Sequence, residues 1–285
     1  MPRSRSIAFL KSAQPTVEGA GVHLHRVFGH PEVPRFDPFL LLDDFGSDDP
    51  DDYVAGFPWH PHRGIETVTY MISGEVEHSD SIGNSGVVGP GDVQWMTAGS
   101  GIIHQEMPRA NGIRLRGLQL WVNLPSGSKM MAPRYQEFTA DSFPVVSPHP
   151  GLRMTVVAGE VVGVRGPVRD VVAEPQYLDI SLEPGADLEH PTPTGHTVLA
   201  YAIDGKGVVG RSGSHTLERG QLALFTDGDS IFAKALDVPF RFVLITGRPL
   251  GEPVAWSGPI VMNTREELAT AFREYQDGTF VKKQD

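Results

Sequence analysis

Two short pairs of potential metal ligands lie in the first half of the sequence. His60 and His62 flank a proline, and His104 and Glu106 flank a glutamine. Residues two apart on a β-strand project from the same face, so each pair would direct two donors to one point. Two neighbouring strands would then offer three imidazoles and one carboxylate to a single cation. This mixed donor set suits iron, manganese, nickel, copper or zinc better than magnesium or calcium, and leaves coordination positions free for substrate or dioxygen.

The other histidines do not repeat this arrangement. His23 and His25 have the same spacing but no partner pair, and we interpret them as a solvated strand face. His190, His196 and His215 lie in the second half without a following His-x-Glu, and we expect surface or structural roles for them. The second half is therefore predicted to lack the ligand set.

Composition narrows the class of protein. The chain has 285 residues, enough for two domains of about 100–150 residues each. A net charge of −11 argues against direct binding to nucleic acid or to an anionic membrane surface. The absence of cysteine excludes disulfides and Cys-ligated metal. With no signal-peptide stretch and no run of ~20 apolar residues, we expect a cytoplasmic protein.

Short alternating or apolar runs between glycine, proline and aspartate turn signals predict an all-β fold. The expected strands are Val22–Phe28, Phe39–Asp43, Thr67–Ser73, Gly74–His78, Asp92–Thr97, Arg114–Asn123, Tyr177–Leu182, Val198–Ile203, Gln221–Thr226 and Phe240–Thr246.

The two halves of the chain echo each other. A strand ending in Gly74 is followed by a second strand entered at Gly91, and the same pattern recurs at Gly205 and Gly220, about 130 residues later. This spacing predicts two copies of one β-barrel unit. A proline-rich connector is expected over Pro125–Gly151.

A helix is predicted near the C-terminus. Thr264 and Glu267 have the spacing of a capping box, and Gly278 is expected to end the helix. An apolar stripe at helical spacing is expected to pack on a barrel, and consists of Leu268, Ala271, Phe272 and Tyr275.

These motifs resemble a known family. The first half matches the cupin pattern at Gly56, His60, His62, Glu66, Gly74, Pro90-Gly91 and His104. The chain is more specifically similar to the pirin family. The stretches that carry this resemblance are Asp37–Phe45, Phe57–Thr69, Gly91–Gly99, Gly101–Glu106, Gln119–Pro125 and Gly258–Thr264.

The resemblance implies a bicupin of two jelly-roll barrels with a short C-terminal helix. Residues 1–132 would form the metal-binding barrel, and residues 133–285 a second barrel without ligands, plus the helix. One iron ion is implied in the first barrel, with other divalent transition metals as alternatives. Its implied ligands are His60, His62, His104 and Glu106. Glu66 is not an expected ligand, and either a hydrogen bond near the site or a structural contact is open to it.

The resemblance also implies an activity. Some relatives open the flavonol quercetin with dioxygen, so the expected function is a quercetin 2,3-dioxygenase acting on a small aromatic substrate and O2. Glu106 would be both ligand and general base for the substrate hydroxyl. The alternative is an iron-dependent regulatory protein that binds a protein partner, a transcription factor or a metabolic enzyme. Trp95 and Trp121 are expected in the core, and Phe57 or Trp59 at the entrance to the site.

Overall fold

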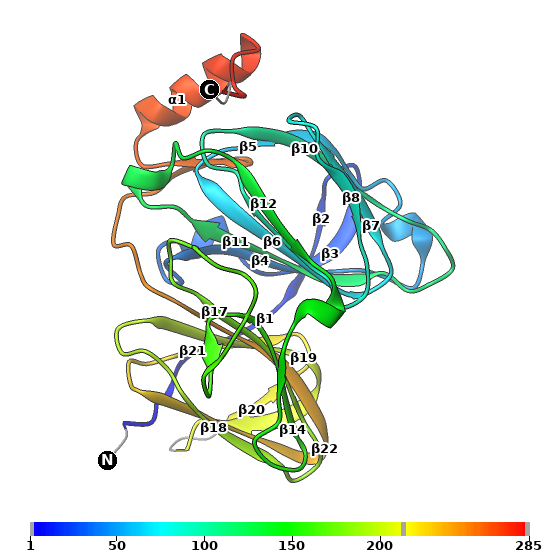
Figure 1. The fold of residues 1–285 in the computed structure, drawn as a ribbon, viewed down its shortest axis with the longest axis vertical. Coiled ribbons are helices and arrows are strands. Elements are labelled where there is room, and N and C mark those ends of the chain that lie inside the picture. The colour runs from blue at the N-terminus through cyan, green and yellow to red at the C-terminus, as the bar shows by residue number, and fades with distance from the viewer. Residues whose placement is uncertain (1–2, 212–214, 283–285) are drawn as a thin grey trace. The chain divides into compact units, whose positions relative to one another are not determined.

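The computed structural model describes residues 3–211 and 215–282, which form two compact β-rich units (Figure 1). The first barrel comprises residues 14–35, 39–140 and the described part of 250–285. The second barrel comprises the described parts of 1–13 and 141–249, with residues 36–38. The all-β prediction is confirmed.

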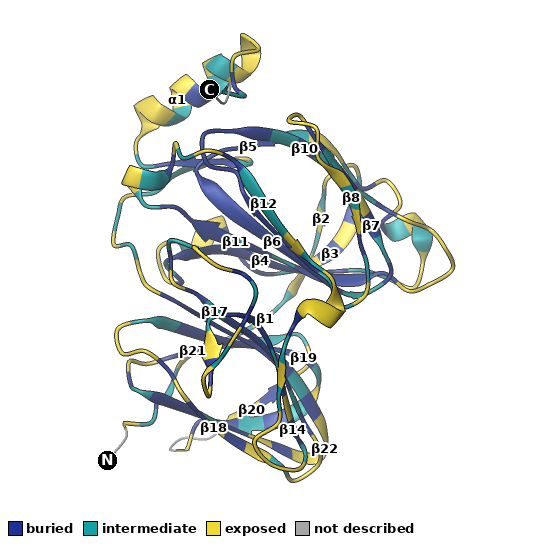
Figure 2. Ribbon diagram, in the orientation of Figure 1, coloured by how far each residue is buried: buried dark blue, intermediate teal, exposed yellow. Residues whose placement is uncertain are grey.

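The first barrel is built on a seven-stranded antiparallel sheet in the order β12-β9-β6-β11-β4-β3-β2. Its strands are β2 (Gln14–Glu18), β3 (Val22–Phe28), β4 (Phe39–Phe45), β6 (Ile65–Ser73), β9 (Val93–Thr97), β11 (Arg116–Asn123) and β12 (Arg134–Phe138). Strand β6 lies inside this sheet, and its first seven residues are buried (Figure 2). The β-branched and aromatic residues of these strands favour this half-buried pleated surface.

A four-stranded sheet in the order β5-β10-β7-β8 completes this barrel. Its strands are β5 (Phe57–His62), β7 (Val76–Asp80), β8 (Ser85–Val88) and β10 (Ile102–Pro108). Short 3-10 helices lie at His30–Glu32, Pro50–Asp52 and Ser126–Ser128.

The C-terminal segment also belongs to the first barrel. It forms a small hairpin of β23 (Ala255–Ser257) and β24 (Ile260–Met262), then helix α1 (Arg265–Gln276). The predicted capping box is present, because Thr264 Oγ1 accepts from Glu267 N at 3.2 Å and Glu267 Oε2 accepts from Thr264 N at 2.9 Å. Ala271 is buried, and Leu268 and Phe272 pack beside it against Ile260, Met262, Phe280 and Ile103.

The second barrel contains a nine-stranded sheet, with β1-β21-β19-β22-β17-β14-β13 as its main path and with β18 and β20 added at β22 and β19. The strands are β1 (Ile7–Ser12), β13 (Val145–Val146), β14 (Leu152–Ala158), β17 (Gln176–Leu182), β18 (Asp187–Pro191), β19 (Thr197–Val209), β20 (His215–Glu218), β21 (Gln221–Phe225) and β22 (Ser230–Gly247). A two-stranded ribbon adds β15 (Glu160–Val161) and β16 (Val164–Arg165). The interior of the second barrel is a contiguous apolar cluster that includes Leu178, Ala200, Phe242 and Leu244.

The division of the chain differs from the predicted boundaries of 1–132 and 133–285. Strand β1 pairs with β21 in the second barrel, whereas the C-terminal hairpin and helix α1 belong to the first. The expected connector also contains β12, which pairs with β9 over five residues. Long-range pairing decides these placements, and such pairing has no signal in local sequence pattern. Among the described residues, no helix has the length and apolar character that a membrane crossing requires.

Candidate metal centre

Three histidines converge inside the first barrel. His60 and His62 come from β5, and His104 comes from the adjacent strand β10, where it lies directly opposite His60. One ring nitrogen from each histidine lies within 4.8 Å of the others. The ring centroids of His60 and His104 are 4.4 Å apart. The two predicted strands are therefore neighbours, and three imidazoles meet at one point.

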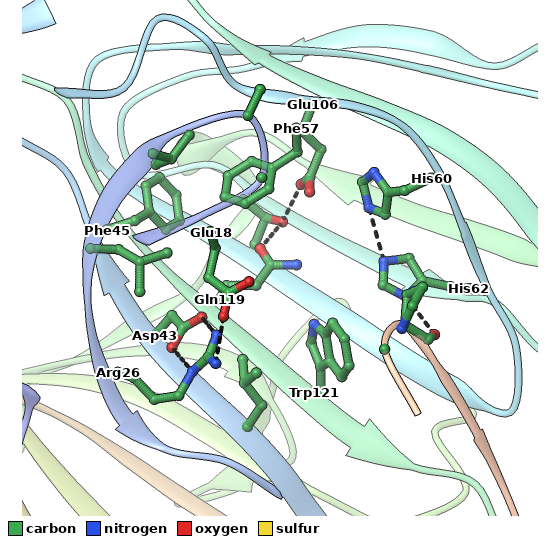
Figure 3. A pocket seen from close by; sticks show the side chains of 18 of the residues that line it. Glu18, Arg26, Asp43, Phe45, Phe57, His60, His62, Glu106, Gln119 and Trp121 are labelled. Carbon is green, nitrogen blue, oxygen red and sulfur yellow. Dashed lines mark hydrogen bonds and ion pairs between the residues drawn. The ribbon is translucent and has the colours of Figure 1, made fainter. Parts of the chain in front are cut away.

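Hydrogen bonds orient two of these rings. His60 Nδ1 donates to the Pro58 carbonyl at 2.9 Å, and His62 Nδ1 donates to the Pro259 carbonyl at 3.0 Å. A neutral imidazole that is protonated at Nδ1 carries its lone pair on Nε2. The two Nε2 atoms are only 3.1 Å apart (Figure 3). Two lone pairs at this distance repel each other unless a cation lies between them and a third donor.

The third donor is His104. This side chain is fully buried, and neither ring nitrogen has a hydrogen-bond partner among the described residues. Buried polar atoms without partners are costly, and a bound ion is one standard explanation for them. The donor set thus fits a transition-metal ion, and a carbonyl that orients each of two ligand rings is the usual support for such a site.

Burial also sets the protonation of the site. It lowers the pKa values of His62 and His104 well below their usual range, and the neighbouring histidines lower them further. Both rings are therefore neutral at pH 7 and keep a lone pair for a metal.

Glu106 lies close to the histidines but is held differently. A β-bulge between β10 and β5 places Glu106 opposite Phe57. Its Oε1 lies 3.1 Å from Thr69 Oγ1, whose one hydroxyl proton goes to Gln119 Oε1 at the shorter distance of 2.7 Å. Among the described residues the cluster of mutually close ligand atoms contains the three histidines and no carboxylate. Burial raises the pKa of Glu106. Its position as fourth ligand remains a proposal.

His60 and His62 line a cavity of about 760 Å³, a volume typical of sites for small organic molecules. Its walls are mainly apolar and include Val22, Leu24, Leu41, Phe45, Phe57, Val76, Leu115 and Trp121. Trp121 is half-buried and contacts His62 edge-on with ring centroids 5.0 Å apart, so the core position expected for it is replaced by one on the cavity wall. Trp95 is buried as expected. Phe57 lines the cavity, whereas Trp59 is 51% exposed and is not among the lining residues.

The C-terminal segment supports strand β5, which carries His60 and His62. The Pro259 carbonyl accepts from His62, and Val261 N donates to the carbonyl of Arg63, the residue after β5, at 3.1 Å. The buried Arg63 guanidinium pairs with Glu274 of α1 at 2.7 Å and donates to the Phe280 carbonyl at 2.9 Å. No sequence motif pointed to Pro259, because it acts through its backbone carbonyl and lies almost 200 residues from His62.

Two further cavity residues, Thr69 and Gln119, were not predicted. Their detectable signal was a polar residue among apolar neighbours on an interior strand. Glu66, for which two roles were open, is fully buried and accepts from Thr97 Oγ1 at 2.7 Å. It lies an odd number of residues from Thr69 on β6, so it faces away from the cavity, and the structural role applies.

The remaining histidines lie outside the cluster. His23 and His25 are exposed as predicted, and His23 pairs with Asp52 at 3.0 Å. His190 is buried in the second barrel, where its Nε2 lies 2.8 Å from Gln176 Oε1, so it is structural rather than a surface residue. Burial lowers its pKa to about 4. His196 is half-buried and His215 exposed.

Comparisons with known proteins agree with this architecture. The Pirin family model matches residues 21–122, and the Pirin C-terminal cupin domain model matches residues 177–281. A Pirin-like protein of Caulobacter vibrioides is 44% identical over 97% of this chain and 99% of its own length. Pirin of Homo sapiens is 41% identical over 97% of this chain and 94% of its own length.

Among solved structures, a quercetin 2,3-dioxygenase from Acinetobacter baumannii superposes with a TM-score of 0.89 at 32% identity, covering 97% of this chain and 98% of that one. Both barrels are matched by family models, and the relatives align over nearly their whole length. The two-barrel fold and its histidine cluster therefore belong to a bicupin, and the chain is a member of the pirin family.

Proposed function

We propose that the protein is an iron-dependent dioxygenase that opens a flavonol-like substrate with O2. One observation carries this proposal: three histidines with mutually close nitrogens, two of them buried, lie at a largely apolar cavity of about 760 Å³, and His60 and His62 line its wall. A cavity of this volume favours a small-molecule substrate over a protein partner, which would need a flat or convex rim. The likeness to a solved quercetin 2,3-dioxygenase supports the same reaction class.

His60, His62 and His104 would hold the metal, with Glu106 as the fourth ligand. When bound, an iron ion supplies a Lewis acid for the substrate hydroxyl and a redox-active centre for dioxygen. The donor set of imidazoles and a carboxylate suits iron and also other divalent transition metals. The protein is expected to carry one such ion per chain, in the first barrel.

Glu106 is the group that we assign as general base. Its Oε1 lies 3.1 Å from Thr69 Oγ1, and the carboxylate lines the cavity, where it would take the hydroxyl proton of a substrate. The apolar walls around it would exclude water and hold a planar ring system in place.

Metal analysis combined with oxygen uptake tests the proposal. His62→Ala and His104→Ala should lose most of the iron that the wild type binds, because each removes one of four donors. A matched control is His25→Ala, which removes an exposed histidine from the same barrel and should retain the metal. Iron-loaded wild type should consume oxygen with quercetin and leave quercetin unchanged without oxygen.

Two results would count against the proposal in different ways. Full iron content in both variants would remove the ligand assignment. Iron-loaded wild type that takes up no oxygen with quercetin would favour the alternative, a regulatory protein whose partner-binding surface responds to the metal.

A further inference from the structure

A row of polar side chains crosses the inner face of the seven-stranded sheet. Register pairs place six residues directly opposite one another on consecutive strands from β12 to β3, and residues that are opposite one another share a face. We call them the polar row: Glu137, Gln94, Thr69, Gln119, Asp43 and Arg26. The last four line the cavity. Polar groups inside a barrel are costly unless they are hydrogen-bonded, so their partners define what the row can do.

The end of the row farthest from the metal is an ion-pair cluster. Arg26 makes two bonds to Asp43, at 2.9 and 2.8 Å, and a third to Glu18 Oε1 at 2.7 Å. The cluster thus holds two carboxylates and one guanidinium. The fixed arginine keeps Glu18 pointing into the cavity, although Glu18 lies at the end of strand β2 (Figure 3).

Two polar atoms on this wall have no protein partner. Glu18 Oε2 and Gln119 Nε2 make no hydrogen bond to any other residue that the structure describes. Gln119 Oε1 accepts from Thr69 Oγ1 at 2.7 Å, so the amide nitrogen of Gln119 is directed away from Thr69. The wall therefore presents an anionic acceptor at Glu18 and an amide donor at Gln119.

The chemistry of these two atoms selects a class of ligand. With two carboxylates against one guanidinium, the far end disfavours a ligand carboxylate and favours a hydroxyl donor. Strands in a sheet lie about 4.8 Å apart, so the three strand intervals from Thr69 to Arg26 span about 14 Å. Phe45 and Phe57 provide an apolar surface along this span. A molecule of two or three aromatic rings with a hydroxyl at its far end fits this arrangement.

We propose that Glu18 and Gln119 are specificity-determining residues, which select neutral aromatic substrates that carry hydroxyl groups on the ring remote from the metal. Glu18 accepts from a hydroxyl of the remote ring. Gln119, one strand from Thr69, donates to an oxygen of the central ring system. This inference rests on the proposed function, because it takes the histidine end of the cavity as the end where the substrate reacts.

Binding of two flavonols to the iron-loaded full chain under nitrogen tests this assignment. Quercetin carries two hydroxyl groups on its pendant ring, and galangin carries none. The wild type should bind quercetin about tenfold more tightly than galangin, since a hydrogen bond to a charged acceptor is worth about a factor of ten or more. Glu18→Gln should remove most of this preference without changing galangin affinity, so galangin also verifies that the variant is folded.

Two more variants separate the roles. Gln119→Leu should weaken both flavonols by a similar factor, about threefold to tenfold, because the oxygen it contacts is common to both. Glu77→Gln is the matched control: like Glu18, Glu77 is a partly exposed glutamate paired with an arginine, Arg109, but it lies outside the cavity. It should bind both flavonols as the wild type does.

The outcomes distinguish this inference from the proposed function. If wild type binds and oxidises both flavonols with equal affinity, or if Glu18→Gln keeps the quercetin preference or weakens galangin equally, the specificity assignment is wrong and the dioxygenase proposal stands. If wild type neither binds nor oxidises either flavonol, both are wrong.

Discussion

Lys129 offers a quantitative test of how the C-terminal segment is attached to the first barrel. Its ammonium group is buried, and Nζ donates to the Asn123 side chain at 2.7 Å and to the carbonyls of Gly64 and Val261 at 2.9 and 3.0 Å. Lys129 therefore links three segments: Gly64 after β5, Asn123 at the end of β11, and Val261 in β24. Burial lowers the pKa of Lys129 from 10.5 to about 8, although Glu252 and Glu267 raise it in part.

This pKa has a defined consequence for stability. The folded-state pKa lies below that of the unfolded chain, so between pH 8 and 10.5 the unfolded state binds more protons. The free energy of unfolding should then rise with pH across this window. Each pKa unit corresponds to about 1.4 kcal/mol, so the contribution of this lysine comes to about 3 kcal/mol.

The perturbation is Lys129→Met, which removes the titrating group and keeps an unbranched chain. Urea unfolding can be followed by tryptophan fluorescence, because all four tryptophans, at positions 59, 95, 121 and 256, belong to the first barrel. Three carbonyl groups lose their donor, so the variant should be less stable overall. Its stability relative to wild type should fall by about a further 3 kcal/mol between pH 7.5 and 10.5.

The difference between the two proteins isolates this one group, because all other titrating groups are common to both. Lys282→Met is the control, since it removes a partly exposed amine from the same unit. Parallel stability curves for wild type and Lys129→Met across this pH range would refute the reasoning, and would mean that the three acceptors fully offset the cost of burial.

Three further predictions concern the site and its support. Gly64 has φ +78°, and a Cβ there would overlap the Val261 carbonyl oxygen, so Gly64→Ala should destabilise the first barrel by at least about 1–2 kcal/mol in the same urea assay; an unchanged midpoint would contradict this. Thr264→Ala should remove the helix cap at a cost of about 1 kcal/mol, seen as faster amide exchange in α1 with iron content unchanged. Glu106→Gln should keep part of the iron and lower flavonol oxidation by roughly 100-fold or more, because an amide takes no proton at neutral pH; wild-type turnover would show that Glu106 is not the base.

Local sequence pattern was sufficient for the ten expected strands, each of which overlaps a strand of the structure, and for the histidine cluster, but not for strands such as β1 and β12. The i, i+2 spacing of His60 and His62 carries its own geometry, and β5 and β10 are neighbours as the two pairs required. The helix was equally local, since its cap and its apolar stripe lie within one segment. These features depend on backbone periodicity, which a single sequence contains.

The parts that the sequence did not reveal depend on distant pairing. The bulge that sets Glu106 opposite Phe57 alters the register of β5 and β10 without a glycine at the bulge to mark it. The polar row exists only because five strand pairings align its members, and its two members closest in sequence, Arg26 and Asp43, are 17 residues apart. The same holds for β1 and β12, whose partners are remote in sequence.

The interlaced division of the chain sets the order in which the barrels are finished during translation. Every segment of the second barrel has been synthesised once residue 249 has been added, but the first barrel still lacks its segment after residue 249. The second barrel, which also holds the N-terminal strand β1, is thus synthesised completely before the first. A nascent chain at that stage contains all three histidines but not Pro259, the acceptor that orients His62. The fully supported metal site therefore requires a chain that extends past Pro259.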